Sequence, residues 1–138
     1  RDVLGSRGLG DVYKRQGRPR RVGPIDLVAT RYGCRIQGAT EVALTKLDVL
    51  SYMKEIPVCT QYEVNGEKTD DFPFTAVIDE AKPVLTTVPG WGCDISGVRK
   101  YEDLPQAARD YVEYVEQAIG VHISYVSVGA GRDEIIYR

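Results

Sequence analysis

The sequence predicts an α/β fold with a mainly parallel sheet, flanking helices and a β-hairpin as an excursion from the sheet. This prediction depends on strand-like segments that alternate with amphipathic helical segments, a pattern typical of βαβ units. It also depends on the dipeptide Asn65-Gly66, which favours a tight hairpin turn. The 138 residues are enough for one domain, or a part of one, with a sizeable core.

The first two predicted elements are a short helix and a short strand. Residues 26–35 carry apolar side chains and a tyrosine at helical spacing, and Asp26 stands where an N-cap residue belongs. Residues 41–45 contain the apolar residues Val42, Ala43 and Leu44, and we expect this segment to be a short buried strand. Lys46 and Asp48 follow at the carboxyl end of this strand.

The middle of the chain has the pattern of a hairpin. Residues 57–64 alternate as a strand does, Asn65-Gly66 fits a type I′ turn, and residues 67–69 form the returning arm. Residues 82–87 are a further predicted strand, which Pro89-Gly90 ends. These strands make up the excursion of the predicted fold.

The clearest predicted helix begins at Leu104-Pro105 and ends at Gly120. Proline suits the first turn of a helix, and glycine suits the position after its last residue. One apolar stripe runs along this helix and consists of Ala108, Tyr111, Val112, Val115 and Ile119. Residues 121–127 are the next predicted strand, and it ends at Gly129-Ala130-Gly131.

The composition is that of an ordinary soluble globular protein, with 43% hydrophobic and 28% charged residues. The sequence has no run of eighteen apolar residues and no signal-peptide pattern, which argues against a membrane association and against export. Cys34, Cys59 and Cys93 are odd in number and widely spaced, with only His122 to join them. We therefore expect reduced thiols in a cytosolic protein rather than a disulfide framework or a zinc site.

Basic residues are concentrated at the start of the chain. Residues 1–21 hold seven of the eighteen Lys and Arg but only two of the twenty Asp and Glu. Such an arm suits a polyanion such as RNA, or a nucleotide phosphate, but a solvated flexible terminus has the same composition. Residues 1–16 lack sustained periodicity and core-forming side chains, so we expect them to be a non-native or disordered leader.

Two short segments suggest recognition of a guanine base. The carboxylate of Asp48 can accept two parallel hydrogen bonds from N1–H and the amino group of guanine, which adenine cannot match. On an extended chain Lys46 would lie on the same side, with its methylene stem along the purine face. Gly129 would let its backbone N–H approach guanine O6, and if the two strands are parallel neighbours both segments face one pocket. The alternatives are an ordinary solvated turn and a simple loop glycine.

Several motifs that agree in order and spacing resemble the C-terminal part of the adenylosuccinate synthetase family. They are Gly17-Arg18-Pro19-Arg20-Arg21-Val22-Gly23, Leu44-Thr45-Lys46-Leu47-Asp48-Val49-Leu50, Pro89-Gly90-Trp91, Leu104-Pro105 and Val126-Ser127-Val128-Gly129. The resemblance covers residues 17–138. It implies that these residues are the C-terminal part of the synthetase domain, within a P-loop-NTPase-like sheet.

The resemblance implies a GTP-dependent ligase of purine biosynthesis that joins IMP and L-aspartate, through 6-phosphoryl-IMP, to form adenylosuccinate. GTP would be a co-substrate, Mg²⁺ would be required, and the full-length enzyme would be a cytoplasmic homodimer. The residues implied to bind the guanine are Lys46, Leu47, Asp48, Ser127, Val128 and Gly129.

The resemblance also implies an arginine loop for the other ligands. Arg18 would contact IMP and aspartate, Arg20 would contact aspartate and GTP, and Gly17 and Pro19 would complete the aspartate-binding loop. An Arg side chain binds a carboxylate at two points and can spread the charge of a transferred phosphoryl group. Without the resemblance, a solvated basic patch would be the better interpretation of this loop.

The chain departs from the family pattern in ways that limit its chemistry. Lys14-Arg15-Gln16 stand where the family usually has two threonines, Pro24 where a Trp is common, and Ala130 where a Pro is common. The sequence has no Gly-rich phosphate loop that ends in Lys. We therefore expect no catalytic residue and no metal ligand in these residues, with the Mg²⁺ ligands upstream, and no synthetase activity for the chain alone.

Two other function classes stay open at this point. A nucleic-acid-binding module would use the basic arm, but the rest of the chain is acidic and lacks interleaved basic and aromatic residues, so we expect no nucleic-acid partner. A switch-type GTPase would need the phosphate loop. We expect Asp70-Asp71 to be a solvated turn, Trp91 to cap the core, and His122 to be a packed or surface residue rather than an acid–base catalyst.

Overall fold

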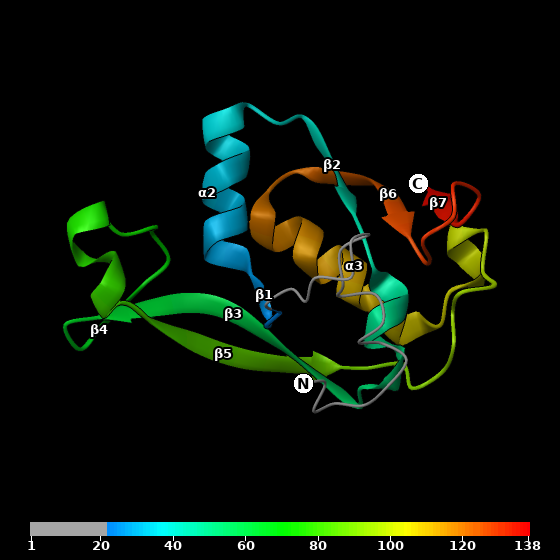
Figure 1. Ribbon diagram of the computed structural model, residues 1–138, viewed down its shortest axis with the longest axis horizontal. Coiled ribbons are helices and arrows are strands. Elements are labelled where there is room, and N and C mark those ends of the chain that lie inside the picture. Colours follow the sequence, from blue (N-terminus) through cyan, green and yellow to red (C-terminus); the bar gives the residue numbers. More distant parts are fainter. Residues whose placement is uncertain (1–21) are drawn as a thin grey trace, which may run out of the picture.

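The computed structural model describes residues 22–138, in which helix α3 (Gln106–Ile119) lies between two small β-sheets (Figure 1). A second helix, α2 (Leu27–Gln37), packs beside α3. Helices and strands share one core, so the predicted α/β class is confirmed.

Helix α3 has the ends and the buried face that its sequence predicts. All five residues of the predicted apolar stripe are buried. Gly120 ends the helix with a left-handed φ of 71°, and its N–H donates a hydrogen bond to the carbonyl of Glu116. Glycine adopts this conformation without steric strain, which explains why the helix ends there.

Helix α2 begins after Asp26, which is its predicted N-cap. Oδ1 of Asp26 accepts a hydrogen bond from the backbone N–H of Ala29 at 2.9 Å. The other carboxylate oxygen accepts a hydrogen bond from the hydroxyl of Tyr62. The pKa of Tyr62 is raised well above its usual value, mainly by burial and next by the hydrogen bond to the carboxylate of Asp26. The start of α2 is therefore tied to the strand that contains Tyr62.

One sheet holds the predicted hairpin. Its strands are β1 (Ile25–Asp26), β3 (Glu55–Val64), β4 (Glu67–Thr69) and β5 (Lys82–Pro89). Strand β1 pairs with β3 in parallel, whereas β4 and β5 pair with β3 in antiparallel fashion. Asn65 and Gly66 have φ values of 53° and 82°, the positive angles that a type I′ turn requires. The predicted hairpin is confirmed.

The other sheet has the order β2–β6–β7, with β2 at Glu41–Leu44, β6 at His122–Ser127 and β7 at Ile135–Tyr137. Strands β2 and β6 are parallel, and β7 is antiparallel to β6. The prediction of a buried strand at 41–45 is wrong in its burial. Exposed and half-buried side chains alternate along β2, because only one of its faces packs against the core.

The arrangement of strands also corrects the prediction of one mainly parallel sheet. The described residues form two separate sheets, and each contains both parallel and antiparallel pairs. The physical reason is that chain reversals are short at two places. The Asn65-Gly66 turn returns β4 directly along β3, and a short loop returns β7 along β6, whereas a parallel neighbour needs a longer crossover.

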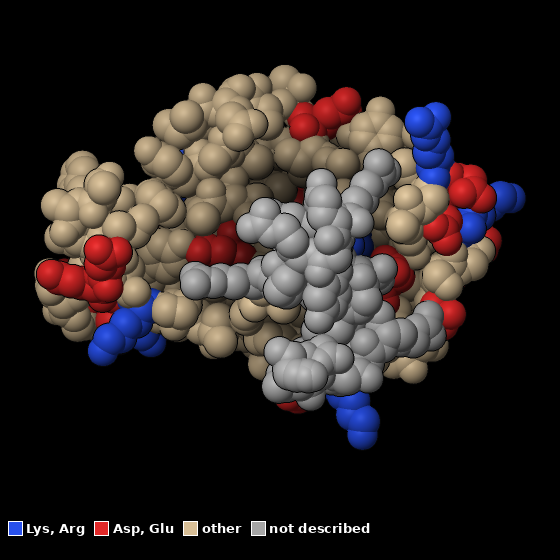
Figure 2. All heavy atoms as spheres, in the orientation of Figure 1, with Lys and Arg blue, Asp and Glu red and all other residues tan. Residues whose placement is uncertain are grey.

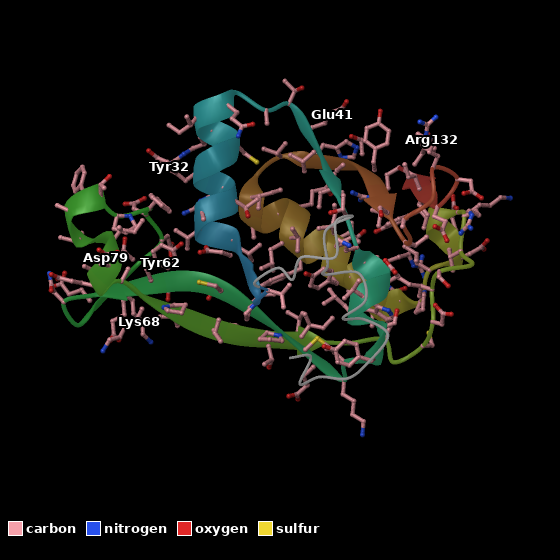
Figure 3. All side chains as sticks on the ribbon, in the orientation of Figure 1. Tyr32, Glu41, Tyr62, Lys68, Asp79 and Arg132 are labelled. Atoms are coloured by element: carbon pink, nitrogen blue, oxygen red, sulfur yellow. The ribbon has the colours of Figure 1, made fainter. Side chains whose placement is uncertain are left out.

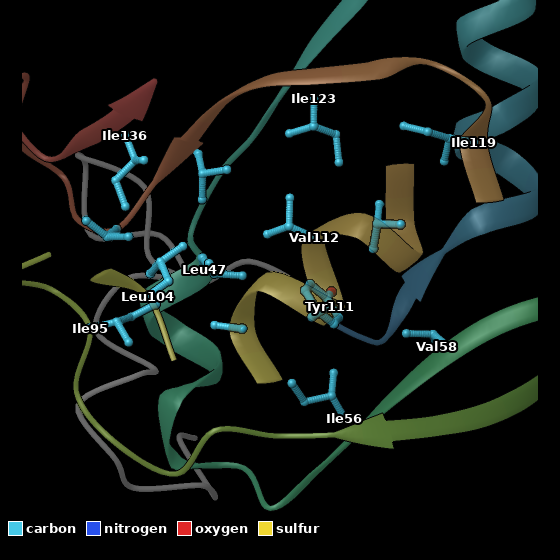
Figure 4. Packing of buried hydrophobic residues seen from close by; sticks show 14 of the residues in the cluster. Leu47, Ile56, Val58, Ile95, Leu104, Tyr111, Val112, Ile119, Ile123 and Ile136 are labelled. Carbon is cyan, nitrogen blue, oxygen red and sulfur yellow. The ribbon is translucent and has the colours of Figure 1, made fainter. Parts of the chain in front are cut away.

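One hydrophobic core joins the two sheets through α3 (Figure 4). Ile56 and Val58 of β3 enter it from one side, and Ile123 and Val126 of β6 enter it from the other. Each fully buried aliphatic side chain contributes about 1.5–3 kcal/mol. Short 3-10 helices connect the strands and α3, namely η1 (Leu47–Tyr52), η2 (Thr75–Glu80) and η3 (Tyr101–Asp103).

Trp91 caps this core, as predicted. Its indole ring meets the ring of Tyr111 edge-on, with 5.9 Å between the ring centroids. Its Nε1–H donates a hydrogen bond to Oγ of Ser51 at 3.1 Å. Tyr111 is buried beneath it, and burial raises the pKa of Tyr111 to about 12.

Candidate functional site

Strands β2 and β6 run to the same edge of their sheet, and the two predicted base-binding segments continue from them. The strands pair in parallel, with Leu44 opposite Val126 in the register. Residues 45–48 and residues 127–129 therefore leave the sheet at the same edge. The condition that the sequence left open, that these two strands are parallel neighbours, is met.

The chain turns sharply at Lys46 and does not continue as the extended segment that we predicted. Lys46 has φ 63° and ψ 34°, a left-handed conformation, and η1 begins at Leu47. For a residue with a side chain this conformation costs about 1–2 kcal/mol. The turn places Leu47 in the core at 1% exposure, which offsets that cost. Lys46 is exposed and Asp48 is half-buried, on either side of this buried anchor in the sequence.

The second segment belongs to the base loop, by which we mean residues 127–131. Oγ of Ser127 donates a hydrogen bond to the carbonyl of Gly129 at 3.0 Å. The backbone N–H of Val128 donates to the carbonyl of Glu134 at 2.9 Å. The side chain of Val128 is fully buried in the same core cluster as Leu47. One hydrophobic support therefore holds both segments.

Sequence reasoning missed Glu134. Its Oε2 accepts a hydrogen bond from the backbone N–H of Gly131 at 2.5 Å, and a Cβ on Gly129 would lie 2.3 Å from its carboxyl carbon. Glycine at position 129 therefore leaves room for the Glu134 carboxylate. This reason for a glycine is different from the predicted one, which was the close approach of a ligand. A signal was present in the sequence, because an acidic residue between Gly-Ala-Gly and the short strand Ile135–Tyr137 is well placed to close a hairpin loop.

Two cavities of the described chain lie away from the predicted base-binding residues. One of about 330 Å³ is bordered by α2, α3 and β3, with Arg31, Thr60 and Gln117 among its lining. Another of about 180 Å³ lies between α3 and the end of β5. Neither is lined by Lys46, Asp48 or the base loop. In the described part of the chain, neither of these cavities encloses the candidate base site.

Charged side chains do not form a single basic surface on the face that Figure 2 shows. Acidic and basic groups stand next to one another at both ends of the molecule (Figure 2). A nucleic-acid interface would instead gather positive charge along one groove or stripe. The face that Figure 2 shows therefore adds no support to the nucleic-acid alternative.

His122 lies at the surface and is held by an ion-pair network. Its Nδ1 lies 2.8 Å from Oε2 of Glu116, and its side chain is 53% exposed. The same carboxylate accepts hydrogen bonds from Arg138 at 2.7 Å and from the backbone N–H of Ile123 at 2.8 Å. Burial alone would raise the pKa of Glu116, but the hydrogen bonds from Arg138, Ile123 and His122 lower it overall. This arrangement joins α3 to β6.

The remaining candidates for special chemistry have ordinary environments. Oδ1 of Asp70 accepts a hydrogen bond from Gln61, and the carbonyl of Asp70 accepts one from Arg31, so this residue belongs to a hydrogen-bonded turn. Cys34 and Cys59 are buried free thiols, and Cys93 is an exposed one. Within residues 22–138, no group of three or more His, Cys, Asp or Glu is arranged to hold a metal ion. None of the helices there has the length and apolar character to cross a membrane.

Gly17, Arg18, Pro19 and Arg20 lie outside the described residues, as does the predicted leader at residues 1–16.

Comparisons with known proteins agree on one family. A family model described as adenylosuccinate synthetase matches residues 3–136. The adenylosuccinate synthetase of Mycobacterium sp. strain KMS is 47% identical over 130 residues, which are 94% of this chain and 30% of that protein. The enzyme of the same name from Mycolicibacterium smegmatis is 48% identical over 130 residues, with the same shares covered. This chain therefore spans about 30% of the length of the curated relatives that it matches.

A solved structure supports the same relationship. The fully ligated adenylosuccinate synthetase from Plasmodium falciparum aligns with a TM-score of 0.87 and 31% sequence identity. The alignment covers 96% of this chain and 32% of that one. The fold of this chain, with its two mixed sheets and the helix between them, therefore matches one part of a longer protein.

Proposed function

Because this chain belongs to the adenylosuccinate synthetase family, we propose that it supplies the guanine-binding part of a ligase that joins IMP and L-aspartate. The reaction would form adenylosuccinate for purine biosynthesis, with GTP as the phosphoryl donor and 6-phosphoryl-IMP as the intermediate. Membership of this family favours the ligase over the switch-type GTPase and the nucleic-acid-binding module as the function to propose.

The observation that carries this proposal is the parallel pairing of β2 and β6. It brings residues 45–48 and the base loop to one edge, although they are far apart in the sequence. Leu47 and Val128 fix both segments to the same core. A backbone that is fixed before the ligand arrives loses little conformational entropy on binding, so such an edge is suited to select a rigid purine base.

Each segment has a separate chemical role in this proposal. The carboxylate of Asp48 accepts hydrogen bonds from N1–H and the 2-amino group of guanine, two donors that adenine lacks at these positions. Backbone N–H groups of the base loop, at Gly129 above all, donate to guanine O6. The methylene stem of Lys46 lies along the purine face. Leu47 and Val128 act through their backbones.

Other parts of the reaction are proposed to lie outside the described residues. Arg18 would contact IMP and aspartate, Arg20 would contact aspartate and GTP, and Gly17 and Pro19 would belong to the same loop. By the resemblance to the family, the Mg²⁺ ligands and the catalytic residues would lie upstream of this chain. The complete enzyme would be a cytoplasmic homodimer with a mainly parallel, P-loop-NTPase-like sheet.

The substitution Asp48→Asn tests this proposal in an exchange protein, by which we mean a full-length relative whose matching segment is replaced by this chain. Losing the charged acceptor should weaken GTP binding by about 1–3 kcal/mol. Xanthine nucleotides should bind more tightly, because their C2 carbonyl can accept a hydrogen bond from the new amide. Binding of both nucleotides is measured by isothermal titration calorimetry.

Asp79→Asn is the matched control, since it removes one exposed carboxylate at the far end of the molecule from Arg132 and β7 (Figure 3). It should leave both affinities unchanged. An unchanged preference for guanine over xanthine in Asp48→Asn would refute the role of Asp48.

A further inference from the structure

The base loop is packed around the carboxylate of Glu134. A Cβ placed on Gly129 would lie 2.3–2.5 Å from the carboxyl carbon and both oxygens of Glu134. A Cβ placed on Gly131 would lie 2.8 Å from Oε2 of Glu134 and also 2.8 Å from Oδ1 of Asp133. Real Cβ atoms essentially never approach heavy atoms so closely. Both positions therefore have to be glycine while the carboxylate keeps this place.

Glu134 also holds the loop through its backbone. Its carbonyl accepts a hydrogen bond from Val128 N–H at 2.9 Å, and its own N–H donates to the carbonyl of Gly131 at 3.1 Å. The next residue, Ile135, begins β7 and pairs with Ser127. The sheet thus fixes the start of this side chain, and its carboxylate reaches back into the loop as a rigid support.

A charged support matters for a loop that uses backbone N–H groups to recognise a base. The hydrogen bond from Gly131 N–H to Glu134 involves an ionised acceptor and is stronger than one between neutral groups. An N–H group aimed at guanine O6 selects that oxygen only if the backbone does not rotate away. The Oγ of Ser127 donates a hydrogen bond to the carbonyl of Gly129 and so restrains the neighbouring peptide of the loop, between Gly129 and Ala130.

We infer that Glu134 is a positioning residue for guanine recognition, which holds the base loop so that the backbone at Gly129 faces O6 of the bound nucleotide. This inference rests on the function proposed above for the same edge of the sheet. It adds to that function a residue that does not touch the base and that the family motifs quoted above do not include.

The test compares GTP with ITP, which has the same O6 but lacks the 2-amino group. In the exchange protein, Glu134→Ala should raise KM about tenfold for GTP and by the same factor for ITP, with kcat within about twofold. Glu134→Gln should raise KM by only about threefold, because the amide oxygen can still accept a hydrogen bond from Gly131 N–H. Asp48→Asn, by contrast, should change the ratio of the two KM values.

Two further variants separate positioning from general stability. Asp79→Asn, the control used above, changes an exposed carboxylate that is not part of the base loop and should leave KM, kcat and the melting temperature unchanged. Gly129→Ala should displace the Glu134 carboxylate, so the double variant with Glu134→Ala should lose much less affinity than the two single losses together. If the losses of affinity in the two single variants simply add in the double variant, the proposed contact between Gly129 and the Glu134 carboxylate is contradicted.

The outcomes distinguish this inference from the proposed function. If GTP is preferred over ITP but Glu134→Ala leaves both KM values unchanged, the inference is wrong and the function stands. If the exchange protein has no preference for guanine, the function fails. Amide hydrogen exchange then decides the structural part, because Glu134→Ala should accelerate exchange at residues 128–131, and unaltered exchange overturns the inference.

Discussion

Replacing Lys46 with glycine should relieve backbone strain and at the same time weaken nucleotide binding. Lys46 adopts a left-handed backbone conformation, with φ 63°, so that Leu47 can enter the core. That conformation costs a residue with a Cβ about 1–2 kcal/mol, and glycine avoids the cost. Glycine loses about 0.5–1 kcal/mol through the greater freedom of its unfolded chain. Relative to alanine at this position, the gain in the free energy of unfolding is therefore between about 0 and 1.5 kcal/mol.

Lys46→Ala is the matched control for this substitution. It removes the same side chain, with whatever contacts that side chain makes, but it keeps the left-handed strain. Urea unfolding should place Lys46→Gly about 1 kcal/mol above Lys46→Ala. Both variants should bind GTP more weakly in the exchange protein, since both lack the stem that is proposed to lie along the purine face.

Equal unfolding free energies for Lys46→Gly and Lys46→Ala would refute this reasoning, because they would mean that the left-handed turn stores no strain. Unaltered GTP affinity in both variants would leave the strain argument intact and would remove Lys46 from the base site. The two measurements thus test the backbone and the side chain separately.

Three further predictions concern packing, pH and activity. Gly90→Ala would place a Cβ 2.0 Å from the carbonyl oxygen of Met53, so unfolding experiments should show a loss of about 1–3 kcal/mol or more, whereas Gly97→Ala, with nothing within 4 Å, should change stability by less than about 0.5 kcal/mol. The pKa of Glu116 is lower in the folded state than its ordinary value of 4.5. The contribution of Glu116 to the free energy of unfolding is therefore fully present at a pH above 4.5 and is lost as the pH falls through the folded pKa. Urea unfolding between about pH 6 and about pH 3 should therefore show a steeper loss for the wild type than for Glu116→Gln, and parallel curves would contradict the network. The 138-residue chain alone should show no GTP- and aspartate-dependent conversion of IMP in a spectrophotometric assay, and a measurable rate would contradict this expectation.

Local signals explain which parts of the fold the sequence predicts well. Helix α3 carries its own start, stripe and stop, and the Asn65-Gly66 turn needs only its two positive φ angles. Such features depend on residues that are close in the sequence. Asp26 as the N-cap of α2 belongs to the same group.

Tertiary contacts explain what the sequence does not predict. The left-handed turn at Lys46 exists because the core accepts Leu47, and nothing in a Lys-Leu-Asp sequence encodes that. Strand β7 has only three residues and forms because β6 is already beside it. Glu134 becomes meaningful only when β7 returns its carboxylate to the two glycines of the base loop.

The pairing of β2 with β6 has a consequence for the order of folding. Glu41 and Ser124, which are hydrogen-bonded across these strands, are 83 residues apart in the sequence. Closing so long a loop has a large entropic cost, so this pairing should form after the hairpin and α3, which lie between the two strands and depend on nearer contacts. During synthesis on a ribosome, β2 leaves the ribosome first with one half of the proposed base site, and the other half is added only when β6 has been synthesised and pairs with β2. Guanine nucleotide would then bind only to chains that have completed this closure, and it would stabilise that last step selectively.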